Sequence, residues 1–239
     1  MKYVAYTSMD EKYYNHCGKP MLLSYKQHWS KLMPLHVYNE DNFNVKVKTI
    51  TPVGWKLGDD YDNFMARHSN DKVKTFAKKG FTVIHAMENI QADRIIWLDA
   101  DTLITEDIPL QLLDLISPED TLSTHFSVWH IKDDIEYHSC ETGFFILNQN
   151  HLGYKEFCET YKDIYVNDKT EGMRRFYDGE IYGRTVDIMA AKGHKMLNLN
   201  PGRHKTPISR SVIAPYISHF KADLKNNIDY TRYQLEDEI

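Results

Sequence analysis

Two aspartates separated by one residue, Asp99 and Asp101, follow directly after an apolar run from Ile95 to Leu98. An unbroken apolar run of this kind predicts a strand that is buried on both faces, as in the parallel sheet of an α/β protein. In open α/β sheets, ligands bind beyond the carboxyl ends of the strands, which is where these two aspartates lie. We therefore expect an α/β protein with a binding site at the end of this strand.

The two carboxylates predict a divalent metal site. An unpaired charge is costly to bury, so carboxylates beside an apolar strand need a cation or water. Hard oxygen ligands suit Mg²⁺ or Mn²⁺, and these ions are usually shared with the phosphates of a substrate. A solvated acidic turn is the alternative interpretation, but the apolar runs on both sides of Asp99 and Asp101 favour the metal site.

The composition limits the class of protein and the kind of partner. The chain has 239 residues with no repeat or linker, which predicts a single domain. Its net charge of −5 argues against a nucleic-acid partner. No apolar run approaches the roughly 18 residues of a membrane span, and Cys17, Cys140 and Cys158 lack the spacing of a disulfide or metal framework. We expect a cytoplasmic protein with reduced thiols and no transmembrane segment.

Strands and helices alternate along the chain. Before the two aspartates, the apolar pattern predicts strands at 2–6, 35–38 and 45–50 and helices at 21–32 and 71–87, with 51–63 as a loop. After them, it predicts strands at 121–130 and 140–148 and helices at 109–113, 154–165 and 186–193. Gly80 interrupts the pattern of the second helix. This alternation predicts a mostly parallel central sheet flanked by helices.

Residues near two of these elements are candidates for nucleotide contacts. Thr7 and Ser8 follow the first predicted strand, where small hydroxyl residues can contact a base or ribose. Alternatively, Ser8 or Asp10 caps the next helix. Lys78 and Lys79 lie in the helix before the aspartates, and we expect one of them to reach a phosphate, while most cations of that helix form a solvated face.

Three later stretches complete a pattern that resembles the GT-A glycosyltransferases. They are T-G-F-F-I-L-N from Thr142, D-G-E from Asp178, and H-F-K-A-D-L-K from His219. Together with the strand and its D-x-D motif, they are similar in order and spacing to the glycogenin and lipopolysaccharide galactosyltransferase family. The resemblance covers roughly residues 1–225 and implies a single GT-A-like, Rossmann-like domain.

The resemblance implies a metal site and a diphosphate site. In that family the D-x-D motif binds Mn²⁺ and the sugar nucleotide, which implies Asp99 and Asp101 as metal ligands and Asp99 as a donor contact. A C-terminal H-x-x-G-x-x-K motif supplies a third metal ligand and a diphosphate-binding lysine, which implies His219 and Lys225 in these roles. Ala222 stands where the family has glycine, which affects how closely the backbone can approach the diphosphate.

The resemblance also implies residues around the transferred sugar. Thr142 and Gly143 match a serine-glycine pair that lines the donor site, with Glu141 in place of the family's asparagine. Asp178 and Glu180 match the ends of a D-Q-D turn and are the candidate catalytic residues. They would orient an acceptor hydroxyl or accept its proton.

The implied activity is the transfer of a hexose from a nucleotide-sugar to an acceptor hydroxyl, with retention of configuration. A UDP-sugar is the expected donor, and the acceptor would be a glycan, a lipid-linked sugar or a protein. Mn²⁺ or Mg²⁺ would neutralise the leaving diphosphate as a Lewis acid. Residues 1–104 would form the nucleotide-binding half, 105–225 the sugar and acceptor half, and 226–239 a tail. The basic loop at 202–210 would close over the donor.

Two other functional classes fit parts of the sequence. The run from Asp99 to Leu103 also fits the first motif of haloacid-dehalogenase-type phosphohydrolases, in which Asp99 is the nucleophile and Asp101 the acid/base, with Mg²⁺. The stretch around Arg184 and Asp187 echoes their last motif out of frame, but 98 residues precede the D-x-D strand here, whereas those enzymes usually begin with it. A non-catalytic sugar-nucleotide-binding module would bind the donor without turnover.

Overall fold

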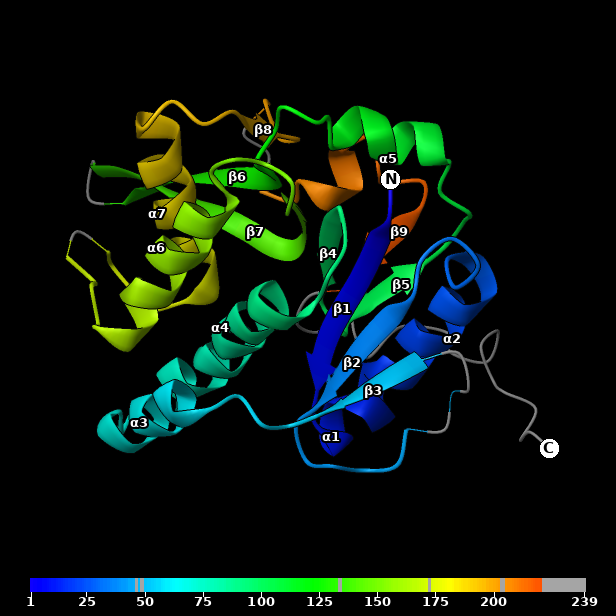
Figure 1. Ribbon diagram of the computed structural model, residues 1–239, viewed down its shortest axis with the longest axis horizontal. Coiled ribbons are helices and arrows are strands. Elements are labelled where there is room, and N and C mark those ends of the chain that lie inside the picture. The colour runs from blue at the N-terminus through cyan, green and yellow to red at the C-terminus, as the bar shows by residue number, and fades with distance from the viewer. Residues whose placement is uncertain (46, 48–49, 133–134, 172, 203–204, 221–239) are drawn as a thin grey trace.

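The computed structural model of the protein describes residues 1–220, apart from 46, 48–49, 133–134, 172 and 203–204. A seven-stranded sheet forms the centre of this part of the chain, with helices on both faces (Figure 1). The order of the strands is β3-β2-β1-β4-β7-β6-β8. Their bounds are β1 Tyr3–Met9, β2 Leu35–Asn39, β3 Ile50–Gly54, β4 Arg94–Leu98, β6 Ser123–Lys132, β7 Ile135–Asn148 and β8 Met196–Asn198.

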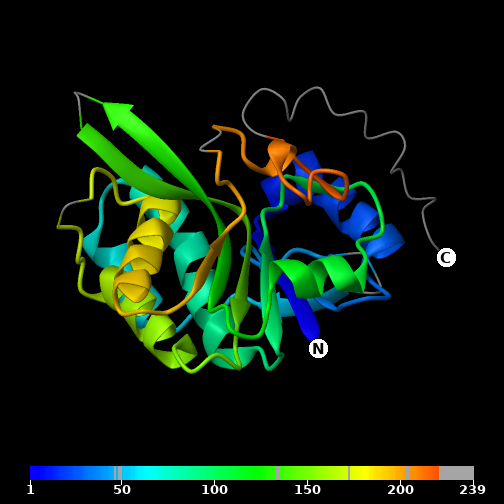
Figure 2. The ribbon, with the colours of Figure 1, turned by 90° about the horizontal axis from the view of Figure 1, so that it is seen from above.

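The sheet is mostly parallel, as predicted. Strands β3, β2, β1 and β4 run parallel to one another, and β8 runs parallel to β6. Strand β7 is antiparallel to both of its neighbours, β4 and β6. The long β6–β7 hairpin extends away from the rest of the sheet (Figure 2). A separate antiparallel pair joins β5 Thr102–Ile104 to β9 Ile217–His219.

The central strands face two cores, one on each side of the sheet. In β4, Ile96 and Leu98 belong to one core with helices α2 Lys19–His28 and α5 Leu110–Ile116. Ile95 and Trp97 belong to the other core, with α4 Asp71–Asn89, α6 Tyr154–Val166 and α7 Asp178–Ala191. Strand β4 is thus buried on both faces, which confirms the prediction from its apolar run.

Two elements near the third strand differ from the prediction. The sequence predicted a strand at 45–50, but β3 begins at Ile50. Ile50 is the residue that pairs with Leu35 at the start of β2. A helix, α3 Asp59–Arg67, begins within the 51–63 region predicted as a loop and continues beyond its end. Only Phe64 of this helix is buried, so its apolar pattern is too sparse to show a helical period, while its three first-turn aspartates favour a helix N-terminus.

Two helices are longer than the pattern predicted. Helix α4 continues through Gly80, where a Cβ atom would overlap the ring of Tyr165, so the glycine allows α6 to pack closely against α4. Helix α7 begins at Asp178, so the D-G-E stretch is the first turn of a helix and not a separate turn. Its aspartate and glutamate lie where negative charge stabilises a helix N-terminus.

The remaining short elements are α1 Glu11–Tyr13, a π-helix at Tyr14–Gly18 and a 3₁₀ helix at Ile208–Arg210 in the basic loop. Among the described residues, no helix combines the length and the apolar character needed to cross a membrane.

Candidate active site

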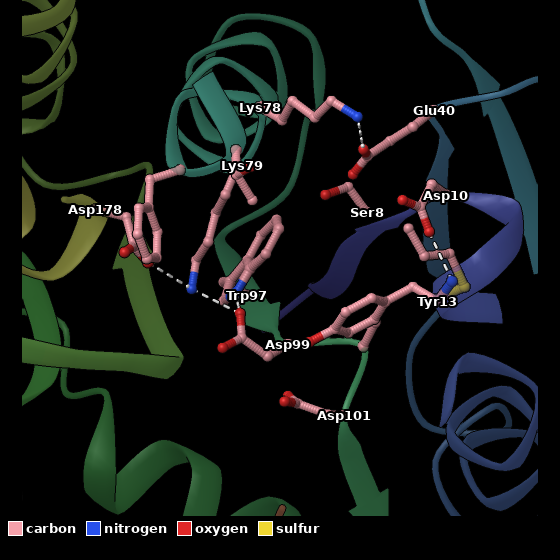
Figure 3. Close-up of a pocket in the computed structure, with 14 residues that line it drawn as sticks. Ser8, Asp10, Tyr13, Glu40, Lys78, Lys79, Trp97, Asp99, Asp101 and Asp178 are labelled. Carbon is pink, nitrogen blue, oxygen red and sulfur yellow. Dashed lines mark hydrogen bonds and ion pairs between the residues drawn. The ribbon is translucent and has the colours of Figure 1, made fainter. Parts of the chain in front are cut away.

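One cavity lies where the order of the strands reverses, between β1 and β4. Strand β1 pairs with β2 on one side and with β4 on the other, and the crevice beyond the carboxyl ends of such strands is the usual ligand site of an open α/β sheet. The cavity measures about 270 Å³ and is lined by residues from β1, the end of β2, α4 and the end of β4 (Figure 3). We call it the switch-point cavity.

The second cavity follows the β6–β7 hairpin and measures about 520 Å³. Its walls include His130 and Tyr137 from the hairpin and Arg175, Tyr177 and Glu180 near the start of α7. We call it the hairpin cavity. Four residues line both cavities, so the two spaces meet at a shared wall, which consists of Phe76, Asp99, Asp101 and Asp178.

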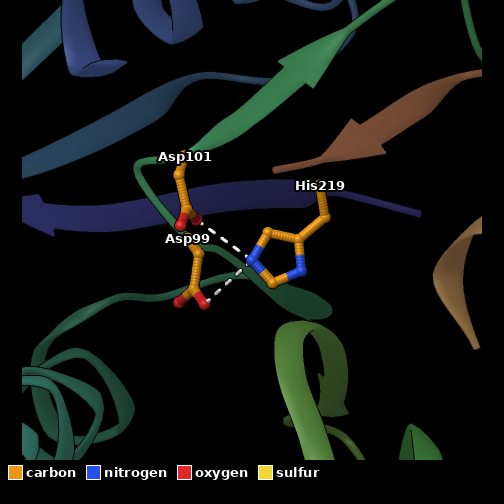
Figure 4. A group of neighbouring side chains, drawn as sticks. All are labelled: Asp99, Asp101 and His219. Carbon is orange, nitrogen blue, oxygen red and sulfur yellow. Dashed lines mark ion pairs between the residues drawn. The ribbon is translucent and has the colours of Figure 1, made fainter. Parts of the chain in front are cut away.

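Asp99, Asp101 and His219 form a cluster at this shared wall (Figure 4). One ligand atom from each residue lies within 4.8 Å of the others. The Nε2 atom of His219 is 3.0 Å from Oδ1 of Asp101 and 3.6 Å from Oδ2 of Asp99. The pairing of β5 with β9 brings His219 opposite Thr102 and so beside the two aspartates, although the chain separates them by more than a hundred residues.

Gly143 makes room for the imidazole. A Cβ atom at this position would lie 2.5 Å from Cε1 of His219, so a larger residue would displace the ring. The carbonyl of Gly143 also accepts a hydrogen bond from the backbone N–H of Asp99, at 3.0 Å, which fixes the start of the acidic turn. The Nδ1 atom of His219 also lies 3.6 Å from Oε1 of Glu141. Strand β7 therefore holds both the histidine and the acidic turn.

The donor set of the cluster fits a divalent ion. Burial alone would lower the pKa of His219, but its hydrogen bond to Asp101 and the negative charge of Asp99 raise that pKa. Burial raises the pKa of Asp99, and the charge of Lys79 opposes this rise. Two carboxylates and an imidazole converge here in a confined space, and they are ligand types that divalent metals take in proteins.

Lys79 links the cluster to Asp178. Its Nζ atom lies 2.6 Å from Oδ1 of Asp99, 2.8 Å from the carbonyl oxygen of Thr142 and 3.0 Å from Oδ2 of Asp178. Burial alone would lower the pKa of Lys79, but the charges of Asp178 and Asp99 outweigh it and raise the pKa. The ammonium is therefore a fixed positive charge between two carboxylates, and it lies 5.0 Å from the ring centroid of Trp97.

Asp178 is held in its ionised form. Burial favours the neutral acid, but the charge of Lys79 and a hydrogen bond from Thr142 outweigh it, so the pKa of Asp178 is lowered. The Thr142 hydroxyl donates this bond at 2.6 Å. Glu180, the other candidate catalytic residue, lines the hairpin cavity and accepts hydrogen bonds at 2.9 Å from the backbone N–H groups of Arg174 and Arg175.

The other predicted nucleotide contacts lie in different surroundings. Ser8 and both lysines, Lys78 and Lys79, line the switch-point cavity. Thr7 is fully buried in β1 and lines neither of the two cavities. Asp10 caps α1, where its carboxylate accepts a hydrogen bond from the backbone N–H of Tyr13 at 2.6 Å. Lys225 and Ala222 lie outside the described residues.

Several residues that line the cavities were not predicted from the sequence. Glu40, Tyr13 and Trp97 line the switch-point cavity, and Tyr137 and Tyr177 line the hairpin cavity. Glu40, like Asp99, is a carboxylate directly after a predicted strand. Its neighbours Asn39, Asp41 and Asn42 are typical turn residues, so the sequence predicted only a turn there. Nothing local in the sequence distinguishes the tyrosines from packing residues.

Comparisons with known proteins identify the fold. No model of a known protein family matches the sequence, and no curated protein sequence matches it. A crystal structure of a glycosyltransferase involved in glycosylation of the major capsid of PBCV-1 matches with a TM-score of 0.56 and 8% identity over 95% of this chain and 100% of that chain. Galactosyltransferase LgtC, in complex with donor and acceptor sugar analogues, matches with a TM-score of 0.58 and 14% identity over 96% and 93% of the two chains.

Mouse xyloside xylosyltransferase 1 is also similar, with a TM-score of 0.52 and 11% identity over 83% of this chain and 85% of that chain. At these low identities, the similarity concerns the fold and not the chemistry. The chain has the fold of the GT-A glycosyltransferases, as the resemblance in the sequence implied.

Proposed function

We propose that the protein is a metal-dependent glycosyltransferase that moves a sugar from a nucleotide-sugar donor to an acceptor hydroxyl. The observation that carries this proposal is the position of the Asp99, Asp101 and His219 cluster, which lies where the switch-point cavity meets the hairpin cavity. A transferase needs two adjoining substrate spaces with the reacting centre between them. The structural neighbours are glycosyltransferases, and the structure of LgtC holds both donor and acceptor analogues.

In this proposal, the donor lies in the switch-point cavity and its diphosphate lies at the cluster. Asp99, Asp101 and His219 would hold Mn²⁺ or Mg²⁺, and the bound ion would neutralise the charge of the leaving diphosphate. Ser8 and Lys78 would lie beside the nucleoside. Lys225 remains the proposed diphosphate-binding lysine by resemblance. A UDP-sugar is the donor we expect.

Asp178 is the stronger of the two candidate catalytic residues. It lies in the wall shared by both cavities, whereas Glu180 lines only the hairpin cavity and already accepts two backbone hydrogen bonds. An ionised carboxylate can accept a hydrogen bond from a sugar hydroxyl and so orient it. Its lowered pKa makes Asp178 a weak base, so we propose that it orients a hydroxyl and does not remove the proton.

The linings of the two cavities support the proposed division of the chain into two halves. Residues of the first half, 1–104, supply most of the switch-point cavity, and residues of the second half supply most of the hairpin cavity. We therefore propose that the hairpin cavity receives the acceptor. Hexosyl transfer with retention is the outcome that the family resemblance implies, and we assign no nucleophile.

The phosphohydrolase alternative has less support. That mechanism needs a second acidic motif near Asp99, and Asp187 was its candidate. Asp187 instead lies 3.0 Å from Nδ1 of His138 and lines a different cavity, together with Arg184 and Met173.

A screen of nucleotide-sugars with Mn²⁺ tests the proposed function. We expect metal-dependent release of the nucleoside diphosphate, faster with an acceptor, and we expect Asp101→Ala to abolish it while the circular dichroism and melting temperature stay near those of the wild type. Binding of the donor without any turnover would instead indicate the binding module. Metal-dependent hydrolysis of a simple phosphomonoester, lost in Asp99→Asn, would support the phosphohydrolase.

A further inference from the structure

Glu40 is a carboxylate that lines the switch-point cavity at the end remote from the metal-binding cluster. It follows β2, and in Figure 3 it lies with Lys78 and Ser8 across the cavity from Asp101. The proposed function puts the donor diphosphate at the cluster, and this inference rests on it. In a nucleoside diphosphate the base is the part farthest from the diphosphate, so the base would lie at the Glu40 end.

The carboxylate of Glu40 is held in place from one side. Lys78 donates a hydrogen bond to its Oε2 atom at 2.9 Å, and the side chain of Glu40 is only 10% exposed. Burial raises the pKa of Glu40, while the hydrogen bond and charge of Lys78 and a hydrogen bond with Ser8 oppose the rise. The nearby carboxylate of Asp10 adds to the rise. A carboxylate has about four acceptor sites, so the two contacts leave it able to accept more.

An ionised carboxylate accepts hydrogen bonds but cannot donate one. Uracil presents an N–H at ring position N3, and guanine presents one at N1. Cytosine and adenine present a bare lone pair at the corresponding positions, which would face the negative charge. Such a mismatch leaves a buried polar group without a partner and costs far more than the loss of an exposed contact.

We propose that Glu40, held by Lys78, accepts the ring N–H of the donor base and thereby excludes bases that present a bare nitrogen at that position. The site would therefore take uracil in preference to cytosine, which has nearly the same size, and guanine in preference to adenine. Glu40 is a specificity-determining residue in this proposal and takes no part in the transfer itself.

The test compares the dissociation constants of UDP and CDP by calorimetry in the presence of Mn²⁺. For the wild type we expect UDP to bind about tenfold more tightly or better, as expected for one buried polar mismatch. Glu40→Gln should reduce this ratio to within about threefold, because an amide both donates and accepts and so tolerates either base. Glu11→Gln is the matched control, since Glu11 is exposed near the cavity without lining it, and it should keep the wild-type ratio.

Each outcome separates this inference from the proposed function. If UDP binds with Mn²⁺ and the ratio of UDP to CDP affinity is unchanged in Glu40→Gln, the inference is wrong and the proposed function stands. If none of UDP, CDP, GDP and ADP binds in a metal-dependent way, the proposed function fails and the inference fails with it. The wild-type protein alone provides a second check, because tighter binding of CDP than UDP, or of ADP than GDP, would also overturn the inference.

Discussion

The Oδ1 atom of Asp99 lies 2.6 Å from the ammonium of Lys79, and the same oxygen accepts a hydrogen bond from the indole of Trp97 at 2.6 Å. The other oxygen, Oδ2, faces His219. The first aspartate of the D-x-D motif therefore has one oxygen bound by protein groups and one directed toward the proposed metal position. This division implies that Asp99 would bind a metal through a single oxygen.

Replacement of Lys79 should destabilise the protein. Lys79→Met leaves Asp99 and Asp178 buried without their shared counter-charge, and removal of one partner from a buried ion pair costs about 3–5 kcal/mol. Urea denaturation at neutral pH measures this loss in the free energy of unfolding. Lys78→Met is the control, because Lys78 is more exposed and pairs with one carboxylate. Equal losses of unfolding free energy in the two variants would contradict the role of Lys79 as the counter-charge shared by Asp99 and Asp178.

Gly143→Ala should weaken metal binding. The added Cβ would lie 2.5 Å from Cε1 of His219, so the ring must shift from its present position beside Asp101. Displacement of a ligand through its supporting residue typically lowers metal affinity about tenfold to hundredfold. Titration with Mn²⁺, followed by electron paramagnetic resonance, measures the affinity. Gly54→Ala serves as the control, since nothing lies within 4 Å of a Cβ there, and an equal effect of both changes would refute the argument.

Gly80→Ala should destabilise the protein, contrary to the usual effect of this change in a helix. Alanine normally favours a helix over glycine by about 1 kcal/mol, but here the methyl group would overlap the ring of Tyr165. Overpacking of a core typically costs about 1–3 kcal/mol. Thermal and urea denaturation measure the change. In a Tyr165→Leu background the penalty should shrink, and a penalty of the same size there would point to another cause.

His125 should make the stability depend on pH. Burial lowers the pKa of this histidine from its usual 6.5 to about 3, so the folded state keeps it neutral where the unfolded state binds a proton. Its contribution is fully present above about pH 6.5 and is lost as the pH falls toward the folded-state value. The free energy of unfolding, measured at several pH values, should therefore fall less steeply below pH 6.5 in His125→Gln than in the wild type. His16→Gln, at an exposed position, should leave the slope unchanged.

Local patterns were enough to place Asp99 and Asp101 after a buried strand, but not to predict the residues that surround them. The strand before Asp99 is evident because its apolar run is continuous, and the spacing of the C-terminal motif identified His219 only through a family resemblance. The start of α7 at Asp178 was missed because its first turn contains Gly179 and little apolar pattern. Lys79 contacts Asp99 and Thr142, which lie 20 and 63 positions further along the chain. No local pattern in the sequence reveals such pairs.

Strand β9 contributes only three residues, yet it is the element that brings His219 to the two aspartates. All seven strands of the main sheet come before it in the chain. As the polypeptide leaves the ribosome, the sheet and both aspartates are therefore made before His219. Assembly of the complete three-residue cluster has to wait for the closure of a long loop by a short strand pair. Capture of a metal ion through all three proposed ligands would therefore have to follow the synthesis of β9 and its pairing with β5.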